Sequence, residues 1–199
     1  MERFTIQTGA YAVNTSIISN GVNALIVDPG ADARYIIDQL AKKGLNPSAI
    51  LLTHAHFDHI GAIPDLQHAF PSLPLYVHPA DLMILSHPIN QMPPDYPSIG
   101  IPLDIRDCRE LKEAEVIETP GHTPGGVCYH FPEDTLLISG DTLFAGSIGR
   151  TDLPLGDAKT LMRSLEKLKS LPDDTLVIPG HGYHTTIGTE KKSNPFLSA

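Results

Sequence analysis

Short apolar runs recur along this chain at intervals that predict the strands of a layered α/β protein. Five runs rich in β-branched and aliphatic residues occupy 24–27, 49–53, 115–119, 136–139 and 176–179. Runs of this length that close at glycine or proline are typical of buried strands, because helices need about twice as many residues. Asn20-Gly21 lies between alternating apolar segments and predicts an early hairpin.

Helices are predicted where apolar residues recur every three or four positions, and not at every second position as in a strand. The stripe within 33–43 predicts a helix that Asp32 caps and Gly44 ends. A second helix is predicted from about Asp58, with Ile60, Ile63 and Leu66 inward. Pro79-Ala80-Asp81 opens a third, since proline suits a first helical turn. The last long helix starts at Asp157, and its inward residues are Leu161, Leu165 and Leu168.

The stretch at 87–102 contains five prolines and is predicted to lack regular structure. Met92, Tyr96 and Ile99 give this stretch apolar side chains to bury. Two interpretations therefore stay open, a surface loop without fixed structure and a lid over a site.

Residues able to bind metals follow four of the predicted strands within a few positions. They are His54, His56, Asp58 and His59 after 49–53, His122 after 115–119, Asp141 after 136–139, and His181 after 176–179. In layered α/β sheets, sites gather beyond the carboxyl ends of strands, so these side chains are expected to converge on one rim. Three histidines and an aspartate within six positions have no packing rationale, which indicates a metal site.

The number of candidates predicts two metal ions. A structural zinc takes four side chains and a catalytic zinc about three, so seven candidates exceed one ion. If residues 54 to 58 form an extended loop, alternate residues point the same way, and Asp58 and His59 diverge. The first ion is assigned His54, His56 and His122; the second is assigned Asp58, His59 and His181. Asp141 follows a glycine that permits a sharp turn and is the expected bridge. The ions are expected to be Zn²⁺, with iron or manganese as alternatives for this donor set.

The other histidines are interpreted as structural, and Asp28 stays ambiguous. These histidines are His68, His78, His87 and His130, and His130 is expected to point outward from an alternating strand at 127–131. Asp28 either orients a ligating imidazole from behind or forms the turn before Pro29-Gly30. Cys128 is expected to be a small core residue.

The ligand motifs resemble those of the metallo-β-lactamase-fold hydrolases. The motifs are His54-Ala55-His56-Phe57-Asp58-His59, Gly121-His122, Gly140-Asp141 and Gly180-His181-Gly182, in that order. The segments at 119–126, 139–144 and 185–190 are most similar to the short, single-domain glyoxalase II (hydroxyacylglutathione hydrolase) branch. The resemblance implies an α/β protein, an αββα sandwich with the metal site at one edge of its two sheets. Residues 1–199 are expected to form one domain.

The activity implied by this resemblance is hydrolysis of a thioester. Two divalent ions lower the pKa of a bridging water, and the resulting hydroxide attacks the thioester carbonyl. Asp58 is the expected catalytic side chain, since it can orient that hydroxide besides binding metal. A thiolate leaves without protonation, which favours a thioester over a lactam as substrate.

Three other functions stay open at this point. The first is a mononuclear iron dioxygenase acting on glutathione persulfide, with His54, His122 and Asp141 as its facial triad. Its relatives usually carry His-Asp-Tyr where this chain has His181-Gly182-Tyr183, which favours a hydrolase. The others are a lactonase and a non-catalytic metal-binding domain, although such domains typically lose ligands that this chain retains.

The expected substrate is a small-molecule thioester, with glutathione as one candidate thiol carrier. Arg150, Tyr183 and His184 are the candidate substrate-binding residues. Arg150 can hold a carboxylate with two hydrogen bonds, or instead pair with Asp152. Larger glyoxalase II enzymes use a C-terminal helical domain for glutathione, and too few residues follow His181 for such a domain.

Composition narrows the partners and the compartment. The formal charge of −9 disfavours nucleic acid as a partner. No apolar stretch reaches the length of a membrane span, and the first residues lack the pattern of a signal peptide. Two cysteines do not form a disulfide scaffold. A cytoplasmic location is therefore expected.

Overall fold

The computed structural model describes residues 1–91 and 98–198 of the chain. Within it the backbone forms two compact units, Met1–Glu110 and Leu111–Ala199, and each is described by itself. That the 199 residues form one domain stays a prediction. Among the described residues, none of the helices has both the length and the apolar character to cross a bilayer.

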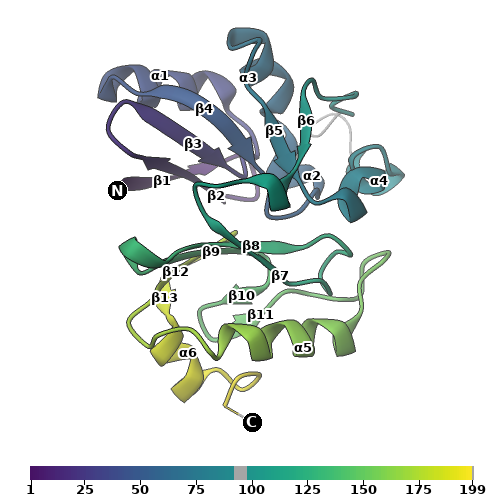
Figure 1. Cartoon of the computed structure of the whole chain (residues 1–199). Helices are drawn as coiled ribbons and strands as arrows, with labels where there is room; N and C mark the ends of the chain where they lie inside the picture. The colour runs from purple at the N-terminus through teal and green to yellow at the C-terminus, as the bar shows by residue number, and fades with distance from the viewer. Residues whose placement is uncertain (92–97, 199) are drawn as a thin grey trace. The chain divides into compact units, whose positions relative to one another are not determined.

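The first unit is built on a six-stranded mixed sheet in the order β1-β2-β3-β4-β5-β6 (Figure 1). Its strands are β1 (Glu2–Thr8), β2 (Val13–Ser19), β3 (Asn23–Val27), β4 (Asn46–Leu51), β5 (Leu75–Val77) and β6 (Ile105–Asp107). The first three are antiparallel, and β3 to β6 are parallel. The hairpin predicted at Asn20-Gly21 is confirmed, because it joins β2 to β3 with Gly21 at a φ of 103°.

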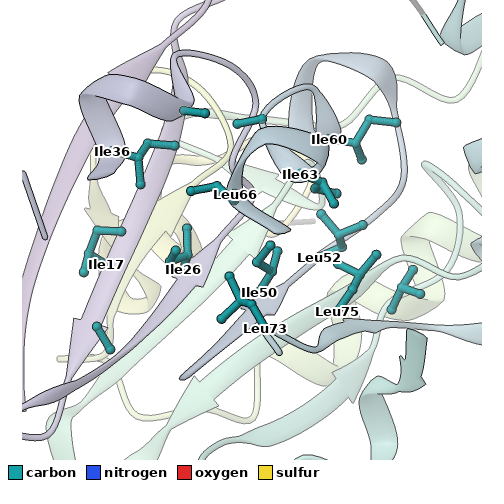
Figure 2. Close-up of a cluster of buried hydrophobic side chains, with 14 of the residues drawn as sticks. Ile17, Ile26, Ile36, Ile50, Leu52, Ile60, Ile63, Leu66, Leu73 and Leu75 are labelled. Atoms are coloured by element: carbon teal, nitrogen blue, oxygen red, sulfur yellow. The ribbon is translucent and has the colours of Figure 1, made fainter. Parts of the chain in front are cut away.

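Short helices connect the parallel strands of this unit. They are α1 (Ala33–Lys43), α2 (Phe57–Ile60), α3 (Ile63–Ala69) and α4 (Leu82–Leu85), with 3-10 turns η1 (Pro79–Asp81), η2 (Pro88–Asn90) and η3 (Cys108–Glu110). In Figure 1, α1 and α3 lie over one face of the sheet. Figure 2 shows the core between them, where Ile36, Ile63 and Leu66 meet strand residues such as Ile26 and Ile50.

The α1 helix begins and ends where predicted, but its first turn is not capped as expected. Gly44 ends it in the left-handed region at a φ of 65°. Asp32 takes a φ of 57°, and its side chain makes no cap hydrogen bond. Its carboxylate instead accepts a hydrogen bond from the backbone N–H of Gly9, at 2.7 Å. The predicted cap is therefore wrong, since a long-range partner has taken the oxygen atoms that would have capped the helix.

The single helix predicted from Asp58 is two helices, α2 and α3. The break falls at Gly61-Ala62, where a Cβ on Gly61 would lie 2.3 Å from the carbonyl oxygen of Gly30. The backbone N–H of Ala62 donates to the carbonyl of Pro29, at 3.0 Å. The β3–α1 loop thus packs too closely for one continuous helix to pass.

Among the described residues of the Pro-rich stretch at 87–102, the turn η2 is the one regular element. Ile99 is half-buried and packs against the core of the first unit. Met92 and Tyr96 lie outside the described residues, so the choice between a surface loop and a lid stays open.

The second unit is built on a five-stranded sheet in the order β13-β12-β9-β8-β7 (Figure 1). Its strands are β7 (Glu115–Glu118), β8 (Val127–Phe131), β9 (Leu136–Gly140), β12 (Leu176–Pro179) and β13 (Thr185–Thr186). The pair β9–β12 is parallel and the other pairs are antiparallel. The remaining elements are η4 (Pro132–Asp134), the hairpin β10 (Leu143–Phe144) and β11 (Ser147–Ile148), α5 (Ala158–Leu168) and α6 (Ile187–Ser193).

The α5 helix confirms its prediction in detail. The Asp157 carboxylate accepts a hydrogen bond from the backbone N–H of Thr160, at 2.7 Å, which satisfies one donor of the first turn. Leu161, Leu165 and Leu168 are fully buried. Leu165 and Leu168 pack in a core that also holds Cys128, as predicted for that cysteine.

His130 does not point outward as predicted. It is buried in β8, and its Nδ1 lies 2.9 Å from Oε2 of Glu115 on the neighbouring strand β7. All five residues of β8 are buried, so both faces of this strand are covered and neither points to solvent. The interpretation of His130 as structural is compatible with this pairing.

Candidate metal centre

The metal-ligand candidates of the first unit gather at one edge of its sheet. Strands β3 and β4 are parallel, with Val27 opposite Leu51, so the chain leaves both strands at the same edge. Asp28 follows β3 directly, and Thr53 and His54 follow β4. The four residues of the predicted cluster, His54, His56, Asp58 and His59, are all buried. A cluster of buried imidazoles and a carboxylate at a strand end fits a metal site.

The imidazole rings of this cluster lie against one another. The ring centroids of His54 and His59 are 4.1 Å apart, and those of His54 and His56 are 4.9 Å apart with nearly perpendicular planes. Asp58 and His59 lie on the turn of α2 and not on an extended loop, which corrects the geometry assumed from the spacing. The turn still brings Oδ2 of Asp58 within 3.8 Å of Nε2 of His59.

Asp28 lies close to two of these rings, to His54 through Thr53 and to His59 directly. Its Oδ1 accepts the backbone N–H of Thr53 at 2.8 Å, and its Oδ2 accepts the Thr53 hydroxyl at 2.6 Å. Because the hydroxyl hydrogen is donated to Asp28, the hydroxyl oxygen can only accept from Nδ1–H of His54, which lies 3.1 Å away. Oδ2 of Asp28 lies 3.1 Å from Nδ1 of His59. In the His54 ring the lone pair is then on Nε2, the nitrogen left for a metal.

The position of Asp28 favours a role in orienting the ligand histidines over a role as a ligand. Its oxygens lie close enough to nitrogens of His54 and His59 to make a three-residue cluster of metal-binding type. Both oxygens, however, already accept hydrogen bonds from Thr53. Of the two interpretations left open for Asp28, this geometry favours the one in which the carboxylate holds an imidazole from behind.

The candidates of the second unit gather in the same way at the end of its sheet. Strands β9 and β12 are parallel, with Pro179 opposite Gly140, and the N–H of Gly180 donates to the Gly140 carbonyl at 2.8 Å. Gly140 has a φ of 48°, as expected of a glycine that turns the chain sharply into Asp141. The turn brings Asp141 beside His181, with Oδ2 and Nε2 3.8 Å apart.

His122 completes this group from the end of β7. Its Nε2 lies 3.6 Å from Oδ2 of Asp141, and its Nδ1 donates to the carbonyl oxygen of Arg150 at 2.7 Å. The lone pair of the ring is again on Nε2. Gly121, before His122, has a φ of 138°, and a Cβ there would lie 2.4 Å from the backbone of Leu161. Glycine is thus required where α5 packs under the His122 turn.

One carboxylate oxygen of Asp141 lies between two imidazoles, as a bridging ligand requires. Oδ2 is 3.6 Å from Nε2 of His122 and 3.8 Å from Nε2 of His181. In this part of the chain the donors are imidazole nitrogens and carboxylate oxygens, with no thiolate among them. Such a set fits zinc, iron or manganese and does not distinguish among them.

Two buried residues of the first unit that the sequence analysis did not select also contact the ligand cluster. Asp81 accepts the backbone N–H of Ala55, and Asn90 donates to the carbonyl of Ala55. Both lie far along the chain from the histidines, and no local pattern in the sequence marks them.

The candidate substrate residues are all at the surface of the second unit. Arg150 makes two hydrogen bonds to the Asp152 carboxylate, each at 2.7 Å, and this arrangement favours the pairing interpretation. The guanidinium lowers the pKa of Asp152 to about 2. Tyr183 is 87% exposed and His184 is also exposed, and a role in substrate binding stays a prediction for all three candidates.

Comparison with known proteins agrees with this geometry. The sequence model of the metallo-beta-lactamase superfamily matches residues 8–181. The chain is 39% identical to the probable metallo-hydrolase YqgX of Bacillus subtilis, over 96% of this chain and 94% of that protein. It is 38% identical to the hydroxyacylglutathione hydrolase GloC of Haemophilus influenzae, over 98% of this chain and 97% of that protein.

Solved structures with the same fold span a range of described proteins. The B3 metallo-beta-lactamase BLEG-1 matches with a TM-score of 0.88 and 37% identity, and the match covers both chains fully. TTHA1623, in a di-iron-bound form, matches with a TM-score of 0.85 and 40% identity, and the match covers 98% of this chain and all of that one. ETHE1 from Myxococcus xanthus matches with a TM-score of 0.79 and 26% identity, and the match covers all of this chain and 85% of that one.

Proposed function

Because the chain belongs to the metallo-beta-lactamase superfamily, we propose that it is a metal-dependent hydrolase of thioesters, of the glyoxalase II type. The observation that carries the proposal is a set of three buried histidines, each with an oxygen atom close to its Nδ1. His54 and His122 have Nδ1 hydrogen-bonded to oxygen, and Nδ1 of His59 lies 3.1 Å from Asp28. This arrangement leaves Nε2 of each ring to a metal.

The proposed site would hold two divalent ions. The first would be held by His54, His56 and His122, the second by Asp58, His59 and His181, and Asp141 would be shared by both. The position of Asp141 Oδ2 between His122 and His181 supports its part as the bridge. Zinc is the proposed metal, with iron or manganese as alternatives.

When bound, such an ion pair supplies an activated water at neutral pH and stabilises negative charge on a carbonyl oxygen. The chain's own residues hold that site in shape. The Arg150 carbonyl holds the Nδ1 proton of His122, and the Asp28 carboxylate lies 3.1 Å from Nδ1 of His59. Asp58 would accept a hydrogen bond from the activated water and orient it. The ligand cluster includes no residue placed as a strong general acid. A thiolate leaves without a proton and an amine does not, so this supports a thioester substrate.

The similarity to GloC supports a glutathione thioester as the substrate. The chain is expected to act on a small molecule, without nucleic acid or membrane as a partner. A cytoplasmic location is part of the same proposal.

The proposal is tested by incubating the metal-loaded protein with S-lactoylglutathione and measuring release of the thiol. Hydrolysis that stops on removal of the metal and returns on its addition is the expected result. A β-lactam tested in parallel, because of the similarity to BLEG-1, should be cleaved far more slowly. A metal-loaded protein inactive on all acyl thioesters would contradict the proposal.

A persulfide dioxygenase is the second candidate, favoured by the likeness to ETHE1 and by iron in the TTHA1623 structure. In that case His54, His122 and Asp141 would hold one iron, and Asp58, His59 and His181 would have no function at the metal. Oxygen uptake with glutathione persulfide separates the two candidates. Uptake without thioester hydrolysis would favour the dioxygenase.

A further inference from the structure

The peptide backbone between the first two ligand histidines is held on both sides by buried side chains. Ala55, between His54 and His56, is fully buried. Its N–H donates to Oδ2 of Asp81 at 3.0 Å, and its carbonyl accepts from Nδ2 of Asn90 at 2.7 Å. These two groups belong to successive peptide planes, so the two hydrogen bonds fix the backbone on either side of Ala55.

The direction of a side chain follows from the backbone at its own Cα. The Ala55 N–H lies in the peptide that joins it to His54, and the Ala55 carbonyl lies in the peptide that joins it to His56. Fixing both planes therefore fixes the directions in which the two imidazoles leave the chain. His54 and His56 are thereby held with their rings nearly perpendicular and 4.9 Å apart.

Asp81 and Asn90 both come from the segment that contains η1, α4 and η2. Asp81 precedes α4 at the position of a helix cap, yet its side chain makes no cap hydrogen bond. Asn90 ends η2, and its Nδ2 also donates to the carbonyl of Ile84 in α4, at 2.7 Å. With its amide nitrogen facing two carbonyl oxygens, the Asn90 side chain has one orientation. The segment thus contacts the backbone of Ala55 through one acceptor, on Asp81, and one donor, on Asn90.

Burial makes these two contacts specific. Asp81 is fully buried and Asn90 is 3% exposed, so water cannot replace either side chain at the Ala55 peptide. A buried N–H or carbonyl that loses its partner is unfavourable, and the backbone rotates to find another. Rotation at Ala55 would misdirect His54 and His56 without touching His59, which α2 and Asp28 hold separately.

We propose that Asp81 and Asn90 are positioning residues that set the metal affinity of the His54–His56 pair. The inference rests on the metal-binding role proposed above. Removal of either side chain weakens binding of the ion held by His54 and His56, by about ten- to a hundredfold, as for other residues that orient ligands. The ion held by Asp58 and His59 keeps its affinity within about threefold.

The experiment compares metal-free wild type with Asp81→Ala, Asn90→Ala and Asp81→Asn. Zn²⁺ alone is titrated into each protein against a chromophoric chelator, which gives the affinity of each ion, and Co²⁺ spectra report ligand geometry. Asp81→Asn retains an oxygen for the Ala55 N–H, so it should lose less affinity than Asp81→Ala. Circular dichroism of the metal-free proteins reports folding.

Gln67→Ala is the matched control. Gln67 is also a buried amide of the first unit, and its Nε2 also donates to two backbone carbonyls, those of Leu73 and Leu103. Its removal should lower stability without changing the affinity for either ion. An equal loss of metal affinity in Gln67→Ala would show that the effect is general destabilisation and would overturn the proposal.

The remaining outcomes separate this inference from the proposed function. Folded Asp81→Ala and Asn90→Ala that bind both ions like wild type would overturn the positioning role and leave the hydrolase intact. If the alanine variants do not fold, the Asp81→Asn variant tests the positioning role. An unchanged Co²⁺ spectrum and an unchanged metal affinity in Asp81→Asn would overturn the proposal for Asp81. Wild type that binds no divalent metal would contradict the proposed function itself.

Discussion

Replacing Asp28 by asparagine keeps the size of a buried side chain and removes one of its two acceptor oxygens. If the new amide nitrogen occupies the place of Oδ2, it faces Nδ1 of His59, and two N–H groups then oppose each other. If it occupies the place of Oδ1, it faces the backbone N–H of Thr53 instead. The first arrangement is relieved when the His59 proton moves to Nε2, where it blocks the nitrogen proposed for the metal.

The size of the effect follows from the number of contacts that depend on this carboxylate. Asp28 accepts two hydrogen bonds from Thr53, and its Oδ2 lies 3.1 Å from Nδ1 of His59. The Thr53 hydroxyl in turn accepts a hydrogen bond from His54. Loss of a group that orients a ligating histidine typically costs ten- to a hundredfold in metal affinity. We therefore expect Asp28→Asn to weaken the more affected ion by about 1.4–2.7 kcal/mol.

The assay is competition for Zn²⁺ with a chelator, performed on metal-free wild type, Asp28→Asn and Thr53→Val. Thr53→Val removes the hydroxyl that holds His54 and keeps the backbone N–H that binds Asp28, so it tests the effect on His54 by itself. We expect Asp28→Asn to lower affinity more than Thr53→Val does. Asp28→Asn that binds both ions with the wild-type affinity would refute the argument that Asp28 sets the histidine protonation.

Three further predictions follow from the second unit. Asp141→Asn should weaken both ions together, measured by elemental analysis, and retention of both would exclude a bridging role. Asp152 has its pKa lowered to about 2 by Arg150, so the pair stabilises the fold above pH 3.8 and is lost as pH falls towards 2. Arg150→Ala should return that pKa towards 3.8 in an NMR titration, and no change would contradict the pairing. Leu165→Ala should lower the free energy of unfolding by about 2–5 kcal/mol in denaturant titrations. A loss below about 1 kcal/mol would contradict the full burial of Leu165.

The sequence predicted the strand ends and most of the helices, because local physical rules determine both. The glycine before Asp141 marked a sharp turn, and the φ of 48° at Gly140 confirms that interpretation. Asp157 caps α5 because its partner, Thr160, lies only three residues away.

The errors arose where a partner lies far along the chain. Asp32 failed as a cap because Gly9, in the loop after β1, takes its carboxylate. His130 is buried because both faces of β8 are covered, which the strand's own alternation cannot reveal. Asp81 lies 26 residues and Asn90 lies 35 residues from Ala55, so no spacing pattern could join them to the histidine cluster.

The central claim, a thioester hydrolase with two metal ions, is tested most directly by counting metal in active protein. Elemental analysis of fully active wild type, alongside thiol release from S-lactoylglutathione, should give close to two divalent ions per chain. His181→Ala should lose one ion and most of the activity while the second ion stays bound. A single ion in fully active, metal-replete wild type would contradict the account.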